Sequence, residues 1–331
     1  MKKSVKLFIA VTLISVLIFN VVSCGRKETT TASDTVTQTE TETPAQDVSV
    51  SPLMWRVTDG EGHTLYLFGT IHIGDERSDA VIERVAPVLE NCDALAVEFD
   101  IVAYETDTQQ MINDMMQYVL PLGSTVSDYM PKDLYDRAYE LLNKAGLTPS
   151  VFRQYNLAWW SQLVDTAMVM LYSGLDTEKA IDGLLIKRAN KKGIPVLEVE
   201  SSGFQMTLLN SFDNELYLLQ IEDSLNNADS YNSEITGLYE LWLSGDKDAL
   251  WTFLQGEETD NGYTEEQIAM IEDYNRKLLD ERNVGMRDKA LEYLKSGQTV
   301  FFAVGSAHMA YENGLVQLLT DAGCTVETFS Y

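Results

Sequence analysis

The sequence predicts an α/β fold with a central mixed, largely parallel sheet and a large helical insertion. Two apolar runs rich in β-branched and aromatic residues, 65–72 and 300–308, each end in Gly-x-x-His, as buried strands that lead into a turn do. Between them, short strand-like runs alternate with amphipathic helical stretches. That order is typical of βαβ units, whose strands pair in parallel.

The N-terminal residues predict export. Residues 1–23 combine a basic start with a long apolar run, which is typical of a secretory signal peptide. Cys24 directly follows Ser23 and resembles a bacterial lipobox, which implies cleavage before Cys24 and lipidation of that residue. An uncleaved membrane anchor is the alternative, because the apolar run approaches the length that spans a bilayer. Both interpretations place the rest of the chain at the cell membrane, on the extracytoplasmic side.

Residues 24–51 predict a disordered tether, and residues 52–331 predict one α/β domain with a helical middle region. The tether is rich in Thr and Glu and has no aromatic residue, so it cannot bury enough apolar surface to order itself. The formal net charge is −27, and it becomes −30 once the three lysines of residues 1–23 are removed. A chain this acidic is a poor partner for nucleic acid or for an anionic membrane surface.

The domain begins with a predicted hairpin and a βαβ unit. Runs 54–58 and 63–70 flank an acidic, glycine-rich turn, which is the pattern of a β-hairpin. Apolar residues then recur at helical spacing over 79–89, and run 94–97 predicts the next core strand. Glu98 follows that strand, so we expect it to lie beside the turn that carries His72. Gly69 and Gly305 are expected to let the backbone turn sharply after their strands.

The rest of the chain predicts further helices and three more strands. Helical spacing covers 111–118, 132–145, 157–171, 176–190, 237–242, 265–279 and 315–322, and strand patterns cover 194–197, 299–304 and 325–329. Glu198 and Glu200 alternate at the end of run 194–197, so both carboxylates should face one side. Residues 280–283 interrupt the apolar pattern inside a long helical stretch.

Histidine is scarce, and its placement is the strongest functional signal. The chain has three histidines, and we expect His63, beside the hairpin turn, to be a surface residue. The other two, His72 and His308, end the matched Gly-x-x-His runs. Open α/β sheets bind ligands at the carboxyl ends of their strands, and imidazole is a common metal ligand and proton shuttle. We therefore expect His72 and His308 to meet across one cleft.

With these motifs in this order, the chain resembles the TraB/GumN/TIKI group over nearly all of residues 53–331. The motifs are Trp55-Arg56-Val57, Gly69-Thr70-Ile71-His72, Val97-Glu98, Gly193-Ile194-Pro195-Val196-Leu197-Glu198, Glu281-Arg282-Asn283, Gly305-Ser306-Ala307-His308, Gly314-Leu315 and Ala322-Gly323-Cys324-Thr325-Val326. The group is similar to the erythromycin-esterase and ChaN-like proteins, which implies an α/β sheet with helical additions.

The resemblance implies several activities. TIKI members are described as divalent-metal-dependent proteases that act on secreted signalling proteins, TraB-type members are linked to blocking a peptide pheromone, and ChaN-like relatives bind haem. Carried over to this sequence, metal-ligand roles fall on His72, His308 and Glu98. Catalytic roles fall on Glu98, Glu198, Arg282 and Asn283.

The residue chemistry is compatible with a hydrolase. Two imidazoles and a carboxylate can hold a divalent ion such as Zn, Mn or Co and leave a position for water. Glu98 or Glu198 is a candidate general base. Arg282 either holds a substrate carboxylate or a developing oxyanion, or pairs with one of these glutamates and braces the fold. The usual zinc-protease, serine-hydrolase and phosphate-binding motifs are absent from the sequence, although Ser306 leaves a Ser-His-Asp arrangement open.

The sequence thus predicts a membrane-tethered, extracytoplasmic, divalent-metal-dependent hydrolase, a peptidase by preference, acting on a peptide or a small molecule. One alternative is a non-catalytic protein that captures a peptide or other ligand in the same cleft. Another is a haem- or metal-carrying lipoprotein with His72 or His308 as an axial ligand. Cys92 and Cys324 each precede a strand, so they can form a disulfide or stay free.

Overall fold

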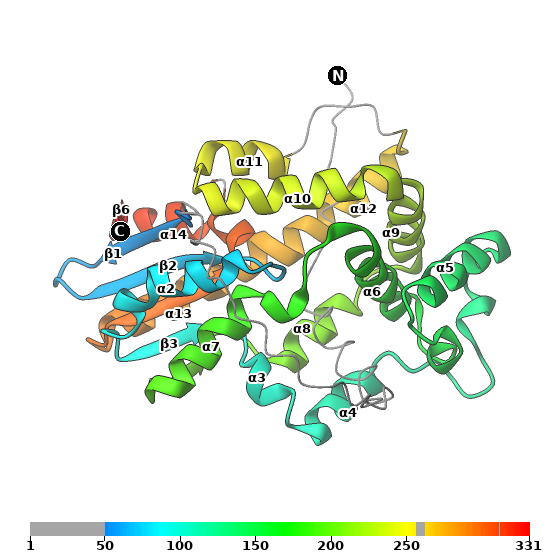
Figure 1. Cartoon of the computed structure of the whole chain (residues 1–331), viewed down its shortest axis with the longest axis horizontal. Helices are drawn as coiled ribbons and strands as arrows, with labels where there is room; N and C mark the ends of the chain where they lie inside the picture. The colour runs from blue at the N-terminus through cyan, green and yellow to red at the C-terminus, as the bar shows by residue number, and fades with distance from the viewer. Residues whose placement is uncertain (1–49, 256–261, 311) are drawn as a thin grey trace, which may run out of the picture.

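A six-stranded sheet forms one side of the molecule and a helical region the other (Figure 1). The computed structural model describes residues 50–255, 262–310 and 312–331. The strands are β1 (Met54–Thr58), β2 (Thr64–Thr70), β3 (Ala94–Val97), β4 (Val196–Glu198), β5 (Val300–Gly305) and β6 (Thr325–Thr328). Their spatial order is β4-β3-β5-β2-β1-β6.

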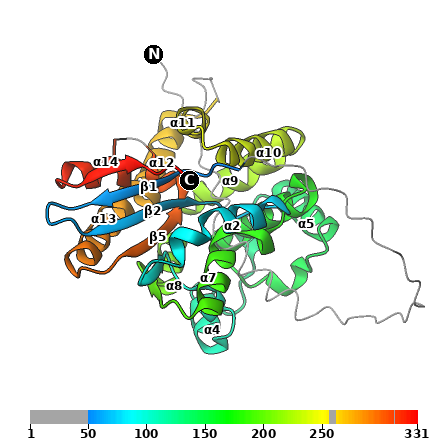
Figure 2. The ribbon, with the colours of Figure 1, turned by 60° about the vertical axis from the view of Figure 1, so that its left-hand side comes forward.

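The sheet is mixed and largely parallel, which confirms the predicted fold class. β1 pairs antiparallel with β2 and with β6, whereas β2 with β5, β5 with β3 and β3 with β4 are parallel. β1, β2 and β5 therefore run side by side although β5 is far along the chain (Figure 2). This pairing buries most of both apolar runs, with Leu65, Leu67, Phe301 and Phe302 inaccessible to solvent.

Helices of the described residues cover the sheet and build the helical region. They are α2 (Arg77–Leu89), α3 (Ile101–Tyr104), α4 (Thr108–Met116), α5 (Lys132–Lys144), α6 (Leu157–Met168), α7 (Ile181–Lys192), α8 (Ser202–Leu209), α9 (Asn214–Asn226), α10 (Ala228–Ser244), α11 (Lys247–Gln255), α12 (Glu265–Asn275), α13 (Glu281–Lys295) and α14 (Leu315–Asp321). Short 3₁₀ or π turns include η3 (Val169–Ser173), η4 (Thr177–Lys179), η5 (Arg276–Asp280) and η6 (Ser306–Met309).

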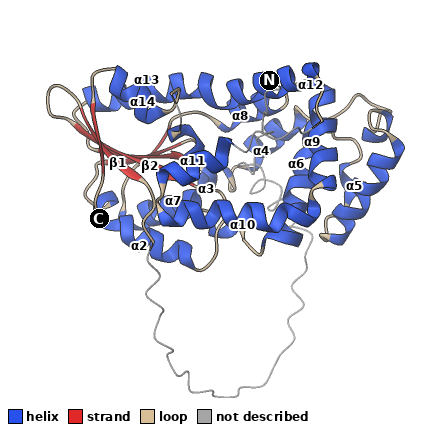
Figure 3. Ribbon diagram, turned by 90° about the horizontal axis from the view of Figure 1, so that it is seen from above, coloured by secondary structure: helices blue, strands red, loops and turns tan. Residues whose placement is uncertain are grey.

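The sheet lies between two helical layers. Seen from above, α13 and α14 lie on one face and α2 and α7 on the other (Figure 3). α2 packs through Val81, Ile82, Val85 and Leu89, which recur at helical spacing and are all buried. Apart from α7 and α13, the helices between β3 and β4 and between β4 and β5 build the helical region, in which α5, α6, α9 and α12 lie together.

One long helix is interrupted by a π turn at the place where the sequence pattern changes. α12, η5 and α13 follow one another without a break, and η5 is the π turn. An inserted π turn rotates the residues after it relative to those before it, and such turns are frequent at functional sites. Arg282 and Asn283, in the first turn of α13, are buried polar residues. These buried polar residues explain why the apolar pattern of the helix is interrupted at residues 280–283.

Val50 and Ser51, the last two residues of the predicted tether, are part of the described structure. Val50 is buried, and the Ser51 amide donates to the Leu243 carbonyl of α10. The expected signal peptide, Cys24 and the remainder of the tether lie outside the described residues. Among the described residues, no helix is long and apolar enough to cross a bilayer.

Cys92 and Cys324 are both buried and free. Cys92 precedes β3 and Cys324 precedes β6, which lie four places apart in the sheet. At about 4.8 Å per strand this places them on the order of 19 Å apart, well beyond the reach of about 7 Å between the Cα atoms of a disulfide.

Candidate functional site

Both Gly-x-x-His motifs lie at the same edge of the sheet because their strands are parallel neighbours. In the register of β2 and β5, Thr70 stands opposite Gly305. A Cβ built on Gly305 would lie 3.6 Å from His72 Nε2, 3.6 Å from His308 Cδ2 and 3.3 Å from Glu98 Oε1. The structure therefore brings His72, His308 and Glu98 together around one backbone position. We call these residues, with Asp182, Glu200, Arg282 and Asn283, the strand-end cluster.

Gly69 and Gly305 were expected to allow a sharp backbone turn, but in the structure they instead leave space for neighbouring side chains and backbone. Neither Gly69 nor Gly305 has a positive φ, and Gly305 has φ −48°. A Cβ on Gly69 would lie 3.1 Å from the Cα of Ser306, which is closer than an ordinary contact. At Gly305, the absent side chain leaves room for the imidazoles and the carboxylate. Close approach, and not backbone conformation, is the reason for glycine at both positions.

His72 is oriented by a carboxylate from the first turn of α7. Its Nδ1 donates to Asp182 Oδ2 at 2.7 Å, and the Thr70 hydroxyl donates to Asp182 Oδ1 at 2.7 Å. An ionised carboxylate only accepts hydrogen bonds, so the Nδ1 nitrogen carries the proton. His72 Nε2 is left to face Gly305. The Ile181 amide donates to the Ile71 carbonyl, which ties this turn of α7 to the His72 loop.

His308 is oriented in the same way by an amide from α13. Its Nδ1 donates to Asn283 Oδ1 at 2.6 Å, while Asn283 Nδ2 donates to the Asn313 carbonyl at 2.8 Å. A carbonyl only accepts, so the bond to Asn313 determines which way the amide points. Both imidazoles thus use Nδ1 for support and present Nε2 to the cluster.

Glu98 forms a buried ion pair with Arg282 and accepts further hydrogen bonds around it. Arg282 Nη2 donates to Glu98 Oε2 at 2.5 Å, and these side chains are 7% and 3% exposed. Gln205 Nε2 donates to the same oxygen, and the Gly305 amide donates to Glu98 Oε1 at 2.8 Å. His308 Nε2 lies 3.9 Å from Glu98 Oε1. The carboxylate therefore has one oxygen held by Arg282 and the other facing the imidazoles.

The second carboxylate that Arg282 binds, after Glu98, is that of Glu200 and not that of Glu198. Arg282 Nε and Nη2 donate to Glu200, and Nη1 donates to the Leu278 carbonyl, so all three guanidinium nitrogens are bonded within the protein. Of the two roles expected for Arg282, the geometry therefore agrees with the one in which it pairs with glutamates and braces the fold. Glu198 is exposed and accepts from the Asp100 amide at 2.9 Å. The structure does not bring Glu198 into the cluster.

The electrostatics distinguish the two imidazoles. Burial, with the nearby charge of Arg282, lowers the pKa of His308 to about 3, so this imidazole is neutral at physiological pH. Burial also opposes the charged form of His72, but the Asp182 carboxylate outweighs it and the pKa of His72 is raised. Burial disfavours ionised Glu98, yet Arg282 outweighs it and lowers the pKa of Glu98. A carboxylate with a low pKa is a weak general base.

The donor chemistry suits a divalent ion. His72 Nε2 and Glu98 Oε1 both border the space at Gly305, and His308 Nε2 lies near Glu98 Oε1. Two nitrogens with one carboxylate oxygen form a common set of ligands for such ions. Two ligands about 2.1 Å from a tetrahedral ion lie about 3.4 Å apart. The 3.9 Å between His308 Nε2 and Glu98 Oε1 is slightly wider. Within the described part of the chain, no group of three or more His, Cys, Asp or Glu side chains already surrounds an ion position.

Sequence reasoning missed Asp182 and Gln205 and preferred Glu198 to Glu200. Asp182 lies in the first turn of a helix, where an acidic residue is common for reasons of helix stability, so it carries no special signal. Gln205 lies on α8 with no recognisable motif. Glu200 was visible through its alternation with Glu198, but only the position of α13 decides which carboxylate Arg282 reaches.

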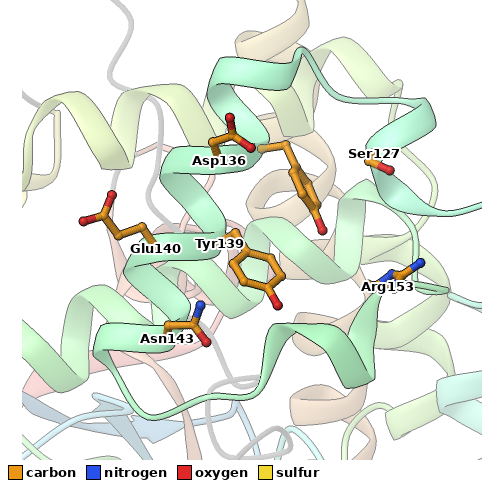
Figure 4. A pocket seen from close by; sticks show the side chains of 7 residues that line it. Ser127, Asp136, Tyr139, Glu140, Asn143 and Arg153 are labelled. Atoms are coloured by element: carbon orange, nitrogen blue, oxygen red, sulfur yellow. The ribbon is translucent and has the colours of Figure 1, made fainter.

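A separate pocket of about 560 Å³ opens in the helical region beside α5. It is lined by Ser127, Tyr135, Asp136, Tyr139, Glu140, Asn143 and Arg153. Figure 4 shows Tyr139 between Asn143 and Arg153, with the Glu140 carboxylate directed away from both. None of the strand-end cluster residues lines this pocket.

Comparisons with known proteins point to one family. The family model described as TraB/PrgY/gumN family matches residues 53–328. An uncharacterized protein YbaP of Shigella flexneri is 25% identical over 265 residues, which cover 78% of this chain and 89% of that protein. The YbaP protein of Escherichia coli K12 is 25% identical over 259 residues, covering 77% of this chain and 87% of that protein. No solved structure gives a significant match.

Proposed function

Because the chain belongs to the TraB/PrgY/gumN family, we propose that its strand-end cluster is the site of a divalent-metal-dependent hydrolase that acts on peptides. The observation that carries this proposal is the shared orientation of His72 and His308. Each donates through Nδ1 to a partner on another element, which leaves His72 Nε2 beside Gly305 and His308 Nε2 beside Glu98 Oε1. Support of this kind is typical of metal-ligating histidines.

His72, His308 and Glu98 are the residues that would hold the ion. When bound, a divalent ion would lower the pKa of a water molecule and polarise a carbonyl group. Asp182 and Asn283 keep the imidazoles in the required tautomer. Arg282 keeps Glu98 ionised, which suits a ligand better than a base. Of the imidazoles, His72 has the raised pKa, so it is the better acceptor for a proton when it is not occupied as a ligand.

A non-catalytic ligand-binding protein is the second candidate. Arg282 pairs with both Glu98 and Glu200, so neither of these two carboxylates is free to act as a base. In this version of the function, a peptide or small ligand binds at the strand ends and is not cleaved.

We further propose that the protein works outside the cytoplasm, tethered to the membrane through Cys24. The basic start, the apolar run and the Ser23-Cys24 junction support this part of the proposal.

Metal analysis and a peptide screen test the hydrolase proposal. Purified full-length protein, dialysed with Zn, Mn or Co, should retain about one ion per chain and cleave peptides from a random library, and a chelator should stop the cleavage. His72→Ala and His308→Ala should lose the ion. Asp182→Asn should weaken metal binding by about 10–100-fold. His63→Ala is the matched control, because His63 pairs with Asp59 outside the cluster.

Three results would separate the candidates. Metal-independent peptide binding without cleavage would favour the non-catalytic protein. A Soret absorption band in the purified protein would favour the haem-carrying alternative. Full metal content in the double variant His72→Ala/His308→Ala would contradict the proposed ligand set.

A further inference from the structure

The pocket beside α5 has walls that hydrogen bonds hold in place. Its lining residues come from α5, from the turn η1 (Val126–Asp128) and from the residue that follows the turn η2 (Pro149–Phe152). The Val126 amide donates to the Arg153 carbonyl at 2.9 Å, which ties η1 to the end of η2. The lining residues are exposed or half-buried, so a ligand can reach the pocket from solvent. The pocket is therefore accessible, and its shape is present before a ligand binds.

One wall of the pocket is aromatic. Tyr135 and Tyr139 are one helical turn apart on α5, with their ring centroids 5.7 Å apart and their planes tilted by 46°. Tyr135 also packs on the fully buried Trp160, with 5.4 Å between the ring centroids, and this contact fixes its position. Both tyrosines are half-buried, and their hydroxyls make no hydrogen bond within the described residues. The two rings thus offer a surface on which another aromatic ring can pack.

The unpaired charge beside these rings is positive. Arg153 is exposed, and its guanidinium makes no ion pair and no hydrogen bond in the part of the chain that the structure describes. Of the two acidic lining residues, Asp136 is paired with Lys132 Nζ at 2.5 Å. Glu140 directs its carboxylate away from Arg153 (Figure 4). A chain with a formal net charge of −27 thus places an unpaired guanidinium in a pocket with two tyrosine rings.

We propose that this pocket binds an aromatic carboxylate, with the carboxylate on Arg153 and the aromatic ring against Tyr135 and Tyr139. A planar guanidinium presents parallel N–H donors that match the two oxygens of a carboxylate. Asn143 lines the same pocket, and its side-chain amide makes no hydrogen bond to the described residues, so it can donate to the ligand as well. The volume of about 560 Å³ lies in the range of about 300–1,000 Å³ that is usual for small-molecule sites.

Two sources supply this chemistry: a free aromatic acid, and the C-terminal aromatic residue of a peptide. A cationic ligand fits less well, because Arg153 would repel it and Asp136 is already paired. None of the strand-end cluster residues lines the pocket. The proposal therefore goes beyond the hydrolase function and does not depend on a bound metal ion.

Calorimetric titration of the full-length protein in the presence of a chelator tests the pocket. The chelator keeps a carboxylate probe from binding to a metal ion at the strand-end cluster, so failure of either proposal is seen separately. N-acetyl-phenylalanine should bind about tenfold more tightly than its neutral amide, and about tenfold more tightly than N-acetyl-glycine, which has no ring. The peptide acetyl-Gly-Gly-Phe identifies the source. Binding at least as tight as that of N-acetyl-phenylalanine assigns the pocket to peptide C-termini, and weaker binding assigns it to a free aromatic acid.

The variants identify the residues. Arg153→Met and Tyr139→Leu should each weaken binding of N-acetyl-phenylalanine about tenfold while the circular dichroism spectrum stays unchanged, whereas Tyr139→Phe keeps the ring and should bind as the wild type does. Arg137→Met is the matched control, since it removes the same charge from an exposed position on α5 outside the pocket. Binding of the acid no tighter than that of its amide or of N-acetyl-glycine, no binding of the acid, or undiminished binding by Arg153→Met would overturn the proposal.

Discussion

At the scale of single residues, the site depends on the absence of a side chain at Gly305 as much as on the polar side chains around it. Gly305 has no side chain, and the space that a Cβ would take is bounded by His72 Nε2, His308 Cδ2 and Glu98 Oε1. Each imidazole is held through Nδ1 by a residue from a different element, Asp182 for His72 and Asn283 for His308. The direction of each Nε2 atom in the cluster is therefore set by a residue from another element.

Gly305→Ala should abolish metal binding while leaving the fold intact. The new methyl group would lie 3.3 Å from Glu98 Oε1, which is tighter than an ordinary contact, and it would fill the position that the imidazoles face. The measurement is calorimetric titration with Zn, with circular dichroism to follow the fold. Gly285→Ala on α13 is the control, because nothing lies within 4 Å of its Cβ position. Unchanged Zn affinity in Gly305→Ala would show that the ion, if any, binds elsewhere.

Asp165→Asn should stabilise the protein more at pH 8 than at pH 4. Burial raises the pKa of Asp165, on α6, to about 7 in the folded state, above the ordinary value of 3.8. Folding thus favours the protonated form, and wild-type stability falls as the pH rises from about 4 to about 7. Asn lacks this penalty, so its advantage should grow by on the order of 3 kcal/mol over that window. Urea unfolding at both pH values measures it, and identical pH profiles of variant and wild type would contradict the shifted pKa.

At the scale of elements, α13 is joined to the sheet by a buried ion pair. Arg282 reaches Glu98 at the end of β3 and Glu200 after β4, and it lies in the first turn of α13, which follows the π turn η5. The four polar residues that interrupt the helical pattern are thus the point where the helix meets the strand ends. The same helix supplies Asn283, so its position determines the orientation of His308 as well.

Arg282→Met should lower the free energy of unfolding by about 3–5 kcal/mol, because it leaves Glu98 and Glu200 buried without a cation. Denaturant unfolding at pH 7 measures the loss. Arg276→Met, in η5 and about half exposed, is the control. Its surface ion pairs should contribute about 1 kcal/mol or less. Equal losses in the two variants would show that the buried pair contributes no more to stability than an exposed one.

At the scale of the whole molecule, a sheet carries the strand-end cluster and a helical region extends from it. The sequence before residue 50 carries the expected export signal. A lipid on Cys24 would hold the strand-end cluster near a membrane at the end of a Thr/Glu-rich segment, where it would meet peptides outside the cytoplasm.

Cys24→Ala should prevent lipid attachment, so that the chain stays as an uncleaved precursor or is released. Mass spectrometry of the membrane fraction should find the wild-type chain beginning at a lipidated Cys24. One acyl chain holds a protein at a membrane only marginally, so more than one chain is expected on that residue. An intact Met1 with unmodified Cys24 in the wild-type protein would instead identify the segment as a membrane anchor.

The sequence by itself determined the sheet, its parallel character and the residues at its edge. Strand runs such as 300–304 are recognisable because burial on both faces requires unbroken apolar residues, and Gly-x-x-His marks where they end. The family also follows from motif order alone. The strand runs and the Gly-x-x-His motifs are local patterns of neighbouring residues, so they can be recognised in a single sequence.

Only the tertiary structure decided which distant side chains complete the cluster. Asp182 and Gln205 lie on helices where nothing distinguishes them from surface residues, and Glu200 was favoured over Glu198 by the reach of Arg282 alone. The need for glycine at 305 likewise comes from atoms of Glu98, His72 and His308, and not from its own φ. Hydrogen bonds between residues 82 to 207 positions apart leave no periodicity in the sequence, because their geometry depends on how whole helices pack against the sheet.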